Sequence, residues 1–217
     1  MKRSIEAVIF DMDGLIIDSE PLWRKAEIEA FKEIGFQFTE QMCIQTMGMR
    51  IDEVVHYWWT KLKWSSPSKN NVVNRIQSKM IDFIKKDGKL LTGVLDTLKL
   101  LKKNKVPIAL ASSSAMLLIE NVIESLEIKE YFSVIHSAEN EPAGKPDPSV
   151  FLTTAKLLEI NPIKCMVLED SKAGMNAGLN ANMKTIVIPE YGTFPSWSKK
   201  ANYTLQSMND FNIELLD

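Results

Sequence analysis

The sequence predicts a doubly wound α/β protein with a mainly parallel sheet and an inserted helical segment. Three observations predict this fold. A short, largely apolar run at residues 5–10 ends in two aspartates, and the next 70 or so residues show only helical spacing of apolar side chains. From residue 90 onward, short apolar runs alternate with helical patterns. Such alternation is typical of right-handed crossovers between parallel strands.

The first apolar run leads directly into Asp11-Met12-Asp13-Gly14. We expect a strand over residues 5–10, buried on both faces, and side chains at i and i+2 of a strand lie on the same side. Asp11 and Asp13 therefore emerge together where the strand ends, which is where ligands bind in open α/β sheets. Two neighbouring carboxylates need a cation or a shared proton. Taken alone, the segment fits a solvated turn equally well.

The second part of the chain is expected to be helical. A first helix begins near Glu20, capped by Asp18 or Ser19, and Gly35 ends it. Further helices are expected from about residue 52 and over residues 71–86. We therefore predict an α/β core of residues 1–16 and 88–217 and a helical cap of residues 17–87.

The third part supplies the remaining strands and helices of the core. The expected strands cover residues 106–111, 134–135, 165–168 and 185–188, with a last edge strand at 203–205. The expected helices cover residues 116–126, 148–158 and 172–181.

One of these strand ends and one loop carry groups that suit an anion. Ser112, Ser113 and Ser114 follow the strand at 106–111, and hydroxyls beside a helix N-terminus suit a phosphate. Lys145 lies between turn-forming residues and can act as a fixed point charge. The alternatives are a serine-rich helix cap and an ordinary surface lysine.

A second acidic pair, Glu169-Asp170, follows the strand at 165–168. Together with Asp11 and Asp13 it forms an all-oxygen cluster of the kind that Mg²⁺ prefers. The alternative is that Asp170 only caps a helix, which leaves Glu169 without a role. A metal site beside an anion site is typical of phosphoryl chemistry.

Composition limits the classes of partner. The 217-residue chain has a net charge of −2 and no long basic run, which argues against nucleic acid. No apolar stretch is long enough to span a membrane. Cys43 and Cys165 are expected to be free thiols of a cytoplasmic protein.

These motifs, in this order, resemble the haloacid dehalogenase (HAD) superfamily of phosphatases with a small α-helical cap. The resemblance covers essentially the whole chain. The sequence around residues 11–23 and 48–52 is closest to the hexitol phosphatase and 2-deoxyglucose-6-phosphate phosphatase group, with β-phosphoglucomutase as a near relative. The resemblance implies a Rossmann-like core.

The resemblance also implies roles for the acidic residues. Asp11 would attack phosphorus and form an aspartyl-phosphate, and Asp13 would act as general acid and base. Mg²⁺ would be held by Asp11, Asp170 and the backbone carbonyl of Asp13, with Glu169 either a direct ligand or a group behind the ligands.

The resemblance assigns substrate binding to the remaining site residues. Ser112, Ser113 and Lys145 would bind the phosphoryl group, and Lys145 would also neutralise the nucleophile. Arg50 is a candidate for contacting the sugar, or else forms a surface ion pair with Asp52 or Glu53. Trp23 walls the sugar pocket or belongs to the cap core.

The expected function is Mg²⁺-dependent hydrolysis of small sugar or sugar-alcohol phosphates such as hexitol phosphates and 2-deoxyglucose 6-phosphate, by a monomer. One alternative is a phosphosugar mutase of the β-phosphoglucomutase type, which the tryptophan at position 23 disfavours because the mutases carry a histidine there. The other is an inactive regulator that binds a phosphosugar, which the presence of both Asp11 and Asp13 disfavours.

Overall fold

Over the residues that the structure describes, the fold is built on a six-stranded parallel sheet. The computed structural model describes residues 4–189 and 194–217. The strand order is β3-β2-β1-β4-β5-β6. The strands are β1 (Ala7–Phe10), β2 (Ile108–Ser112), β3 (Val134–Ser137), β4 (Cys165–Glu169), β5 (Lys184–Val187) and β6 (Tyr203–Thr204). The order reverses between β1 and β4, so the carboxyl ends of these central strands form the crevice where ligands bind in such sheets.

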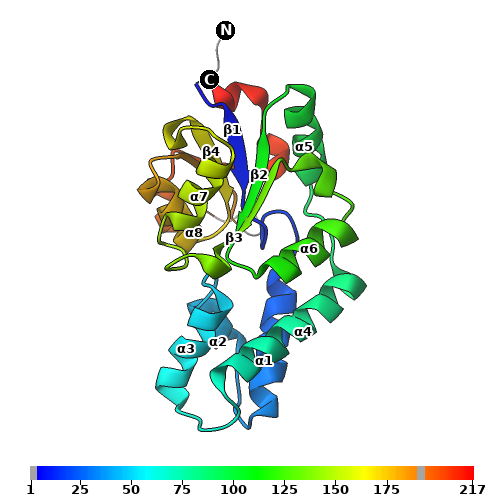
Figure 1. Cartoon of the computed structure of the whole chain (residues 1–217), viewed down its shortest axis with the longest axis vertical. Coiled ribbons are helices and arrows are strands. Elements are labelled where there is room, and N and C mark those ends of the chain that lie inside the picture. Colours follow the sequence, from blue (N-terminus) through cyan, green and yellow to red (C-terminus); the bar gives the residue numbers. More distant parts are fainter. Residues whose placement is uncertain (1–3, 190–193) are drawn as a thin grey trace.

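Helices cover both faces of the sheet (Figure 1). On one face lie α5 (Val94–Lys103) and α6 (Met116–Ser125), and on the other lie α7 (Ser149–Leu157) and α8 (Lys172–Asn180). Alternate residues of β1 enter different cores: Val8 packs in the larger cluster and Ile9 in the smaller one. Burial on both faces explains why the central strands are almost wholly apolar.

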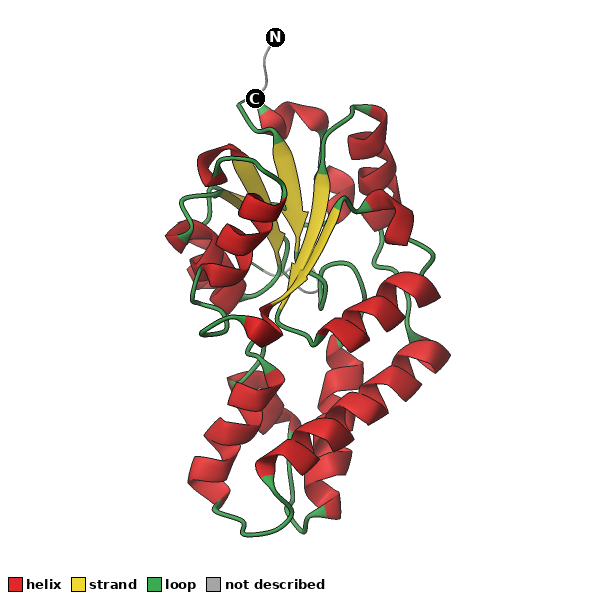
Figure 2. Ribbon diagram, in the orientation of Figure 1, coloured by secondary structure: helices red, strands yellow, loops and turns green. Residues whose placement is uncertain are grey.

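In the sequence, β1 is followed by four helices before the rest of the core begins. These are α1 (Glu20–Glu33), α2 (Glu40–Gln45), α3 (Ile51–Leu62) and α4 (Lys69–Asp87). They form a separate layer opposite the carboxyl ends of the strands (Figure 2). The long α4 packs against α1 and α3 and also touches α6 of the core. The helical segment therefore covers the crevice between β1 and β4.

The predicted fold class is confirmed, and most predicted elements lie within two residues of their observed bounds. The short α2 and the first core helix, α5, were not predicted. Ser19 is at the N-cap position of α1, but its hydroxyl makes no cap bond and binds Asp13 instead. Cys43 and Cys165 are buried and free, as expected. Within the described residues, no helix is long and apolar enough to cross a membrane.

Candidate active site

A cavity lies between the carboxyl ends of the central strands and the helical segment. Its core side is formed by residues that follow β1, β2 and β4, together with Lys145. Its other side is formed by α1, α2 and the loop before α3. The lining includes Asp11, Asp13, Glu20, Trp23, Arg24, Glu27, Cys43, Thr46, Met47, Ser112, Ser113, Ser114, Lys145, Asp170 and Ser171.

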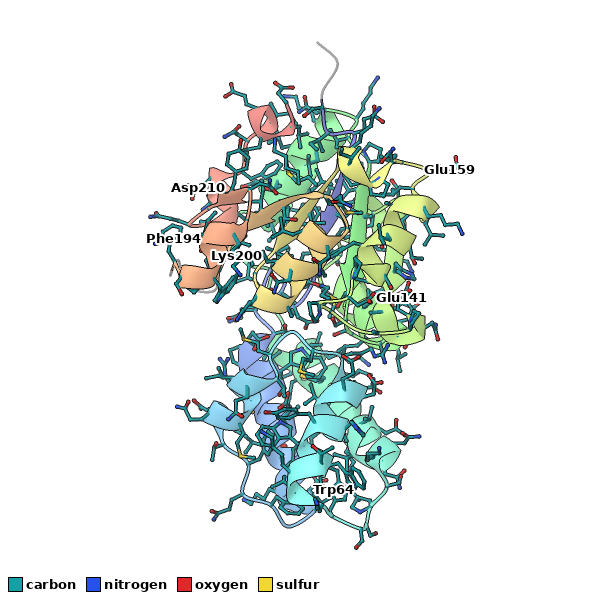
Figure 3. The ribbon with its side chains drawn as sticks, turned by 90° about the vertical axis from the view of Figure 1, so that its left-hand side faces the viewer. Trp64, Glu141, Glu159, Phe194, Lys200 and Asp210 are labelled. Carbon is teal, nitrogen blue, oxygen red and sulfur yellow. The ribbon has the colours of Figure 1, made fainter. Side chains whose placement is uncertain are left out.

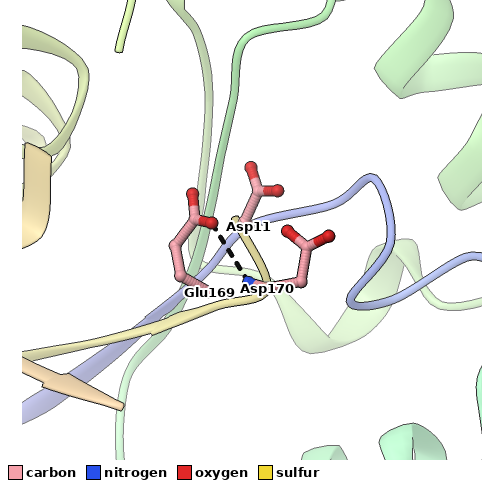
Figure 4. A group of neighbouring side chains, drawn as sticks. All are labelled: Asp11, Glu169 and Asp170. Atoms are coloured by element: carbon pink, nitrogen blue, oxygen red, sulfur yellow. Dashed lines mark hydrogen bonds between the residues drawn. The ribbon is translucent and has the colours of Figure 1, made fainter. Parts of the chain in front are cut away.

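Three carboxylates meet on the core side of this cavity. Asp11, Glu169 and Asp170 each offer an oxygen within 4.8 Å of the others (Figure 4). Lys145 Nζ donates to Asp11 Oδ1 at 2.5 Å and to Glu169 Oε1 at 2.7 Å. All four side chains are buried. One lysine thus faces three acids, which leaves an excess of negative charge in a region with little water.

The burial and charge of this cluster shift the pKa values of its members. Burial raises the pKa of Asp11 to about 8, although the charge of Lys145 opposes the shift. Burial also raises the pKa of Asp170, and the nearby Glu169 adds to that shift. Burial lowers the pKa of Lys145, but Asp11 and Glu169 outweigh it and the net shift is upward. A divalent cation would supply the missing positive charge, and the donor atoms are oxygens that suit Mg²⁺.

The two oxygens of Glu169 are already engaged by the protein. Oε1 accepts from Lys145, and Oε2 accepts from the backbone N–H groups of Asp170 and Ser171 and from the Ser171 hydroxyl at 3.0–3.1 Å. A Cβ at position 174 would lie 1.6 Å from Glu169 Oε1, so only glycine leaves room for this carboxylate. Glu169 therefore connects Lys145, through hydrogen bonds, to the backbone of the loop that follows β4.

Gly14 makes room for Asp170 in a similar way. Its φ of +73° favours glycine, and an added Cβ would lie 2.2 Å from Asp170 Oδ2. The turn after β1 is therefore shaped to bring Asp11 and Asp170 together.

Asp13 faces a different environment, although it is only two residues from Asp11. Its Oδ1 accepts from Ser19 Oγ and from Trp23 Nε1, both at 2.7 Å. Its Oδ2 accepts from Ser114 Oγ at 2.8 Å and from Ser112 Oγ at 3.4 Å. Asp13 is thus held by neutral donors, at the border between the core and α1.

The phosphate-binding candidates also line the cavity. Ser112 Oγ accepts from the backbone N–H of Ser114 at 3.0 Å. Ser113 Oγ donates to the carbonyl of Gly48 at 3.3 Å, which joins the end of β2 to the loop before α3. Together with Lys145, these residues place hydroxyl groups and one positive charge beside Asp11.

The structure places Arg50 outside the cavity lining. Its guanidinium pairs with Asp52 at 2.7 Å and donates to the carbonyls of Ala138 and Glu141 at 3.0 and 2.9 Å. Figure 3 shows Glu141 on the core, at its border with the helical segment. Nearby, the backbone N–H of Gly144 donates to Glu53 Oε1. In this arrangement Arg50 joins the two parts of the protein, and contact with a sugar would require these bonds to be exchanged.

Sequence reasoning gave no site role to Glu20 or Glu27, which both line the cavity. It proposed Ser114 for binding an anion but not as a partner of Asp13, and it proposed Glu53 only as an ion-pair partner of Arg50. Glu27 had a visible signal, because it is four residues after Trp23 and three before Ala30 and so interrupts the apolar stripe of α1. The two histidines lie outside this lining: His56 contacts Lys69, and His136 contacts Glu141.

A parallel α/β sheet that brings paired acids, a lysine and serines to one edge defines a class of phosphoryl-transfer or related hydrolytic enzymes. Residues 8–188 match the family described as haloacid dehalogenase-like hydrolase. The chain belongs to this family of hydrolases. The predicted membership is thereby confirmed.

Individual relatives agree with this assignment. The chain is 39% identical to hexitol phosphatase B of Escherichia coli over 188 residues, which cover 86% of this chain and 85% of that protein. It is 30% identical to a phosphorylated carbohydrates phosphatase of Thermotoga maritima, over 84% of each chain. A crystal structure of β-phosphoglucomutase from Clostridium difficile superposes with a TM-score of 0.84 at 28% identity, covering 97% of this chain and 95% of that one.

Proposed function

We propose that the protein is a Mg²⁺-dependent phosphatase of small sugar or sugar-alcohol phosphates that works through an aspartyl-phosphate. The observation that carries the proposal is the different surroundings of Asp11 and Asp13. Asp11 lies beside Lys145 and two further carboxylates, whereas Asp13 is bound by neutral donors next to α1. These environments fit a nucleophile and a general acid–base group, respectively.

In the first step, a carboxylate oxygen of Asp11 attacks the phosphorus and the bond to the sugar oxygen breaks. Lys145 and the hydroxyl of Ser112 bind phosphoryl oxygens, and Asp13 gives its proton to the departing oxygen. In the second step, Asp13 takes a proton from water, which attacks the phosphorus and releases Asp11.

The bonds around Asp13 suit both of its protonation states. The hydroxyls of Ser19 and Ser114 can either donate or accept, so they can turn when Asp13 gains or loses its proton. The indole of Trp23 can only donate. Trp23 therefore fixes the position of Oδ1, while the serines adapt to the proton.

Asp11 and Asp170 would hold the metal, with the backbone carbonyl of Asp13. Bound Mg²⁺ supplies charge that keeps Asp11 ionised and stabilises negative charge on the phosphoryl group. Because both oxygens of Glu169 already accept hydrogen bonds, we propose that Glu169 orients Lys145 and lies behind the direct ligands.

We also propose that residues 17–87 act as a cap that selects the substrate. The cavity is lined on one side by α1 and by the loop before α3, so a substrate bound there would contact this segment. Relatives named for hexitol phosphates and phosphorylated carbohydrates support a polyhydroxylated leaving group. The protein is proposed to be a cytoplasmic monomer.

A phosphosugar mutase is the second candidate, because a β-phosphoglucomutase shares the complete fold. The test is phosphate release from a panel of hexitol and hexose phosphates, with Mg²⁺ and with EDTA. Mg²⁺-dependent release supports the phosphatase. Interconversion of glucose 1-phosphate and glucose 6-phosphate without phosphate release supports the mutase. The absence of both activities would contradict both candidates.

A further inference from the structure

Glu27 on α1 has a buried carboxylate oxygen without a partner. Only 7% of the residue's surface is exposed. Among the side chains of the described residues, its Oε2 is the one buried nitrogen or oxygen without a hydrogen bond. Buried polar atoms are rarely left without a partner in folded proteins, so each exception calls for an explanation such as an absent ligand.

Glu27 belongs to the lining of the active-site cavity. Trp23, which binds the catalytic Asp13, precedes it by one helical turn on the same face of α1. One turn advances about 5–6 Å along a helix. Glu27 is therefore displaced from Asp13 along α1, into the helical segment and away from the phosphoryl site.

We infer that Glu27 binds a hydroxyl group of the substrate's carbon chain and so selects polyhydroxylated phosphate esters. A hydroxyl that donates to Oε2 would satisfy the unpartnered oxygen. The inference rests on the proposed phosphatase function, and it adds a residue that discriminates between leaving groups.

The surroundings of Glu27 support this role. Arg24 and Glu20, on the same helix, form an ion pair with each other, with 3.7 Å between Arg24 Nη1 and Glu20 Oε2. Burial raises the pKa of Glu27 to about 7, although its contact with the Cys43 thiol lowers it. Near neutral pH the group can therefore accept from a hydroxyl or donate to one. An apolar residue at this position would remove both possibilities.

The test compares two substrates in two variants. Hexitol 6-phosphate carries hydroxyls, whereas p-nitrophenyl phosphate has none on its leaving group. Glu27→Leu is expected to lower the ratio of kcat/KM for the hexitol ester to kcat/KM for the aryl ester by about 10–100-fold, because a site built to bind a hydroxyl loses that contact. Glu27→Gln keeps an acceptor and is expected to lower the ratio less. Glu29→Gln, on the same helix but paired with Lys79, is the matched control and should leave the ratio unchanged.

An unchanged ratio in Glu27→Leu, in an active and folded enzyme, would overturn the inference. If the wild type hydrolyses no ester, the proposed function fails, and Glu27 is then judged by binding. Calorimetry of hexitol 6-phosphate with Asp11→Asn and with Asp11→Asn/Glu27→Leu should show weaker binding by the double variant. Equal affinities, or no binding by either protein, would overturn the inference.

Discussion

Replacing Glu27 with glutamine is expected to stabilise the protein at alkaline pH and to have little effect at acidic pH. The carboxyl group is buried, and its pKa rises from an ordinary 4.5 to about 7. The folded state therefore holds the proton more tightly than the unfolded chain does. The favourable contribution of the group is complete below about pH 4.5 and is lost as the pH rises through about 7.

The size of the change in stability follows from the pKa of Glu27 in the unfolded and in the folded state. The two pKa values differ by about 2.5 pH units, and each unit corresponds to about 1.4 kcal/mol, so ionised Glu27 costs about 3 kcal/mol at pH 8. The neutral thiol of Cys43 and the charges of Arg24 and Glu20 remain in both proteins. Glutamine has nearly the same shape as glutamate but no charge to desolvate.

The assay is urea unfolding of the wild type and of Glu27→Gln at pH 5 and pH 8, in the same buffer with EDTA. Asp11 and Asp170 also have raised pKa values, but they titrate in both proteins and cancel in the difference. The stability difference between the proteins should grow by about 2–3 kcal/mol from pH 5 to pH 8, because a small part of the effect is already present at pH 5. A difference that is the same at both pH values would refute the argument. Glu29→Gln serves as the surface control.

Three further substitutions test the site. Lys145→Met leaves Asp11 and Glu169 without their shared cation and should destabilise the fold by about 3–5 kcal/mol in urea unfolding without metal, whereas Lys156→Met at the surface should change it by less than about 0.5 kcal/mol. Trp23→Phe keeps an aromatic side chain but removes the indole N–H that donates to Asp13, and should lower kcat for hexitol 6-phosphate about 10-fold; Trp59→Phe, which makes the same change of ring elsewhere, is the control. Gly14→Ala pushes Asp170 away and should weaken Mg²⁺ in activation titrations about 10-fold or more. An unchanged free energy of unfolding in Lys145→Met, an unchanged kcat in Trp23→Phe, or an unchanged Mg²⁺ requirement in Gly14→Ala would contradict the corresponding expectation.

The sequence could predict the strand ends because local rules determine them. An apolar run that stops at Asp11 or at Glu169 marks the end of a buried strand, and parallel strands bring those ends to one edge. The grouping of Asp11, Glu169 and Lys145 in space agrees with that prediction.

The side-chain partners could not be predicted in the same way. Trp23 is spaced as a core residue of α1, and only the approach of α1 to the turn after β1 brings its indole to Asp13. Arg50 is beside two acids in the sequence, yet two of its bonds reach carbonyls about 90 residues away. Such contacts depend on how the helical segment sits on the core, which no local pattern encodes.

The proposed mechanism depends most on Asp11 being the group that becomes phosphorylated. The direct test uses Asp13→Asn, which should slow release of the phosphoryl group, with p-nitrophenyl phosphate, whose leaving group needs no proton. After acid quenching, mass spectrometry should find one phosphoryl group on the peptide that contains Asp11 when Mg²⁺ is present, and none in EDTA or in Asp11→Asn/Asp13→Asn. A phosphoryl group on another residue, or full hydrolysis by Asp11→Asn, would contradict the account.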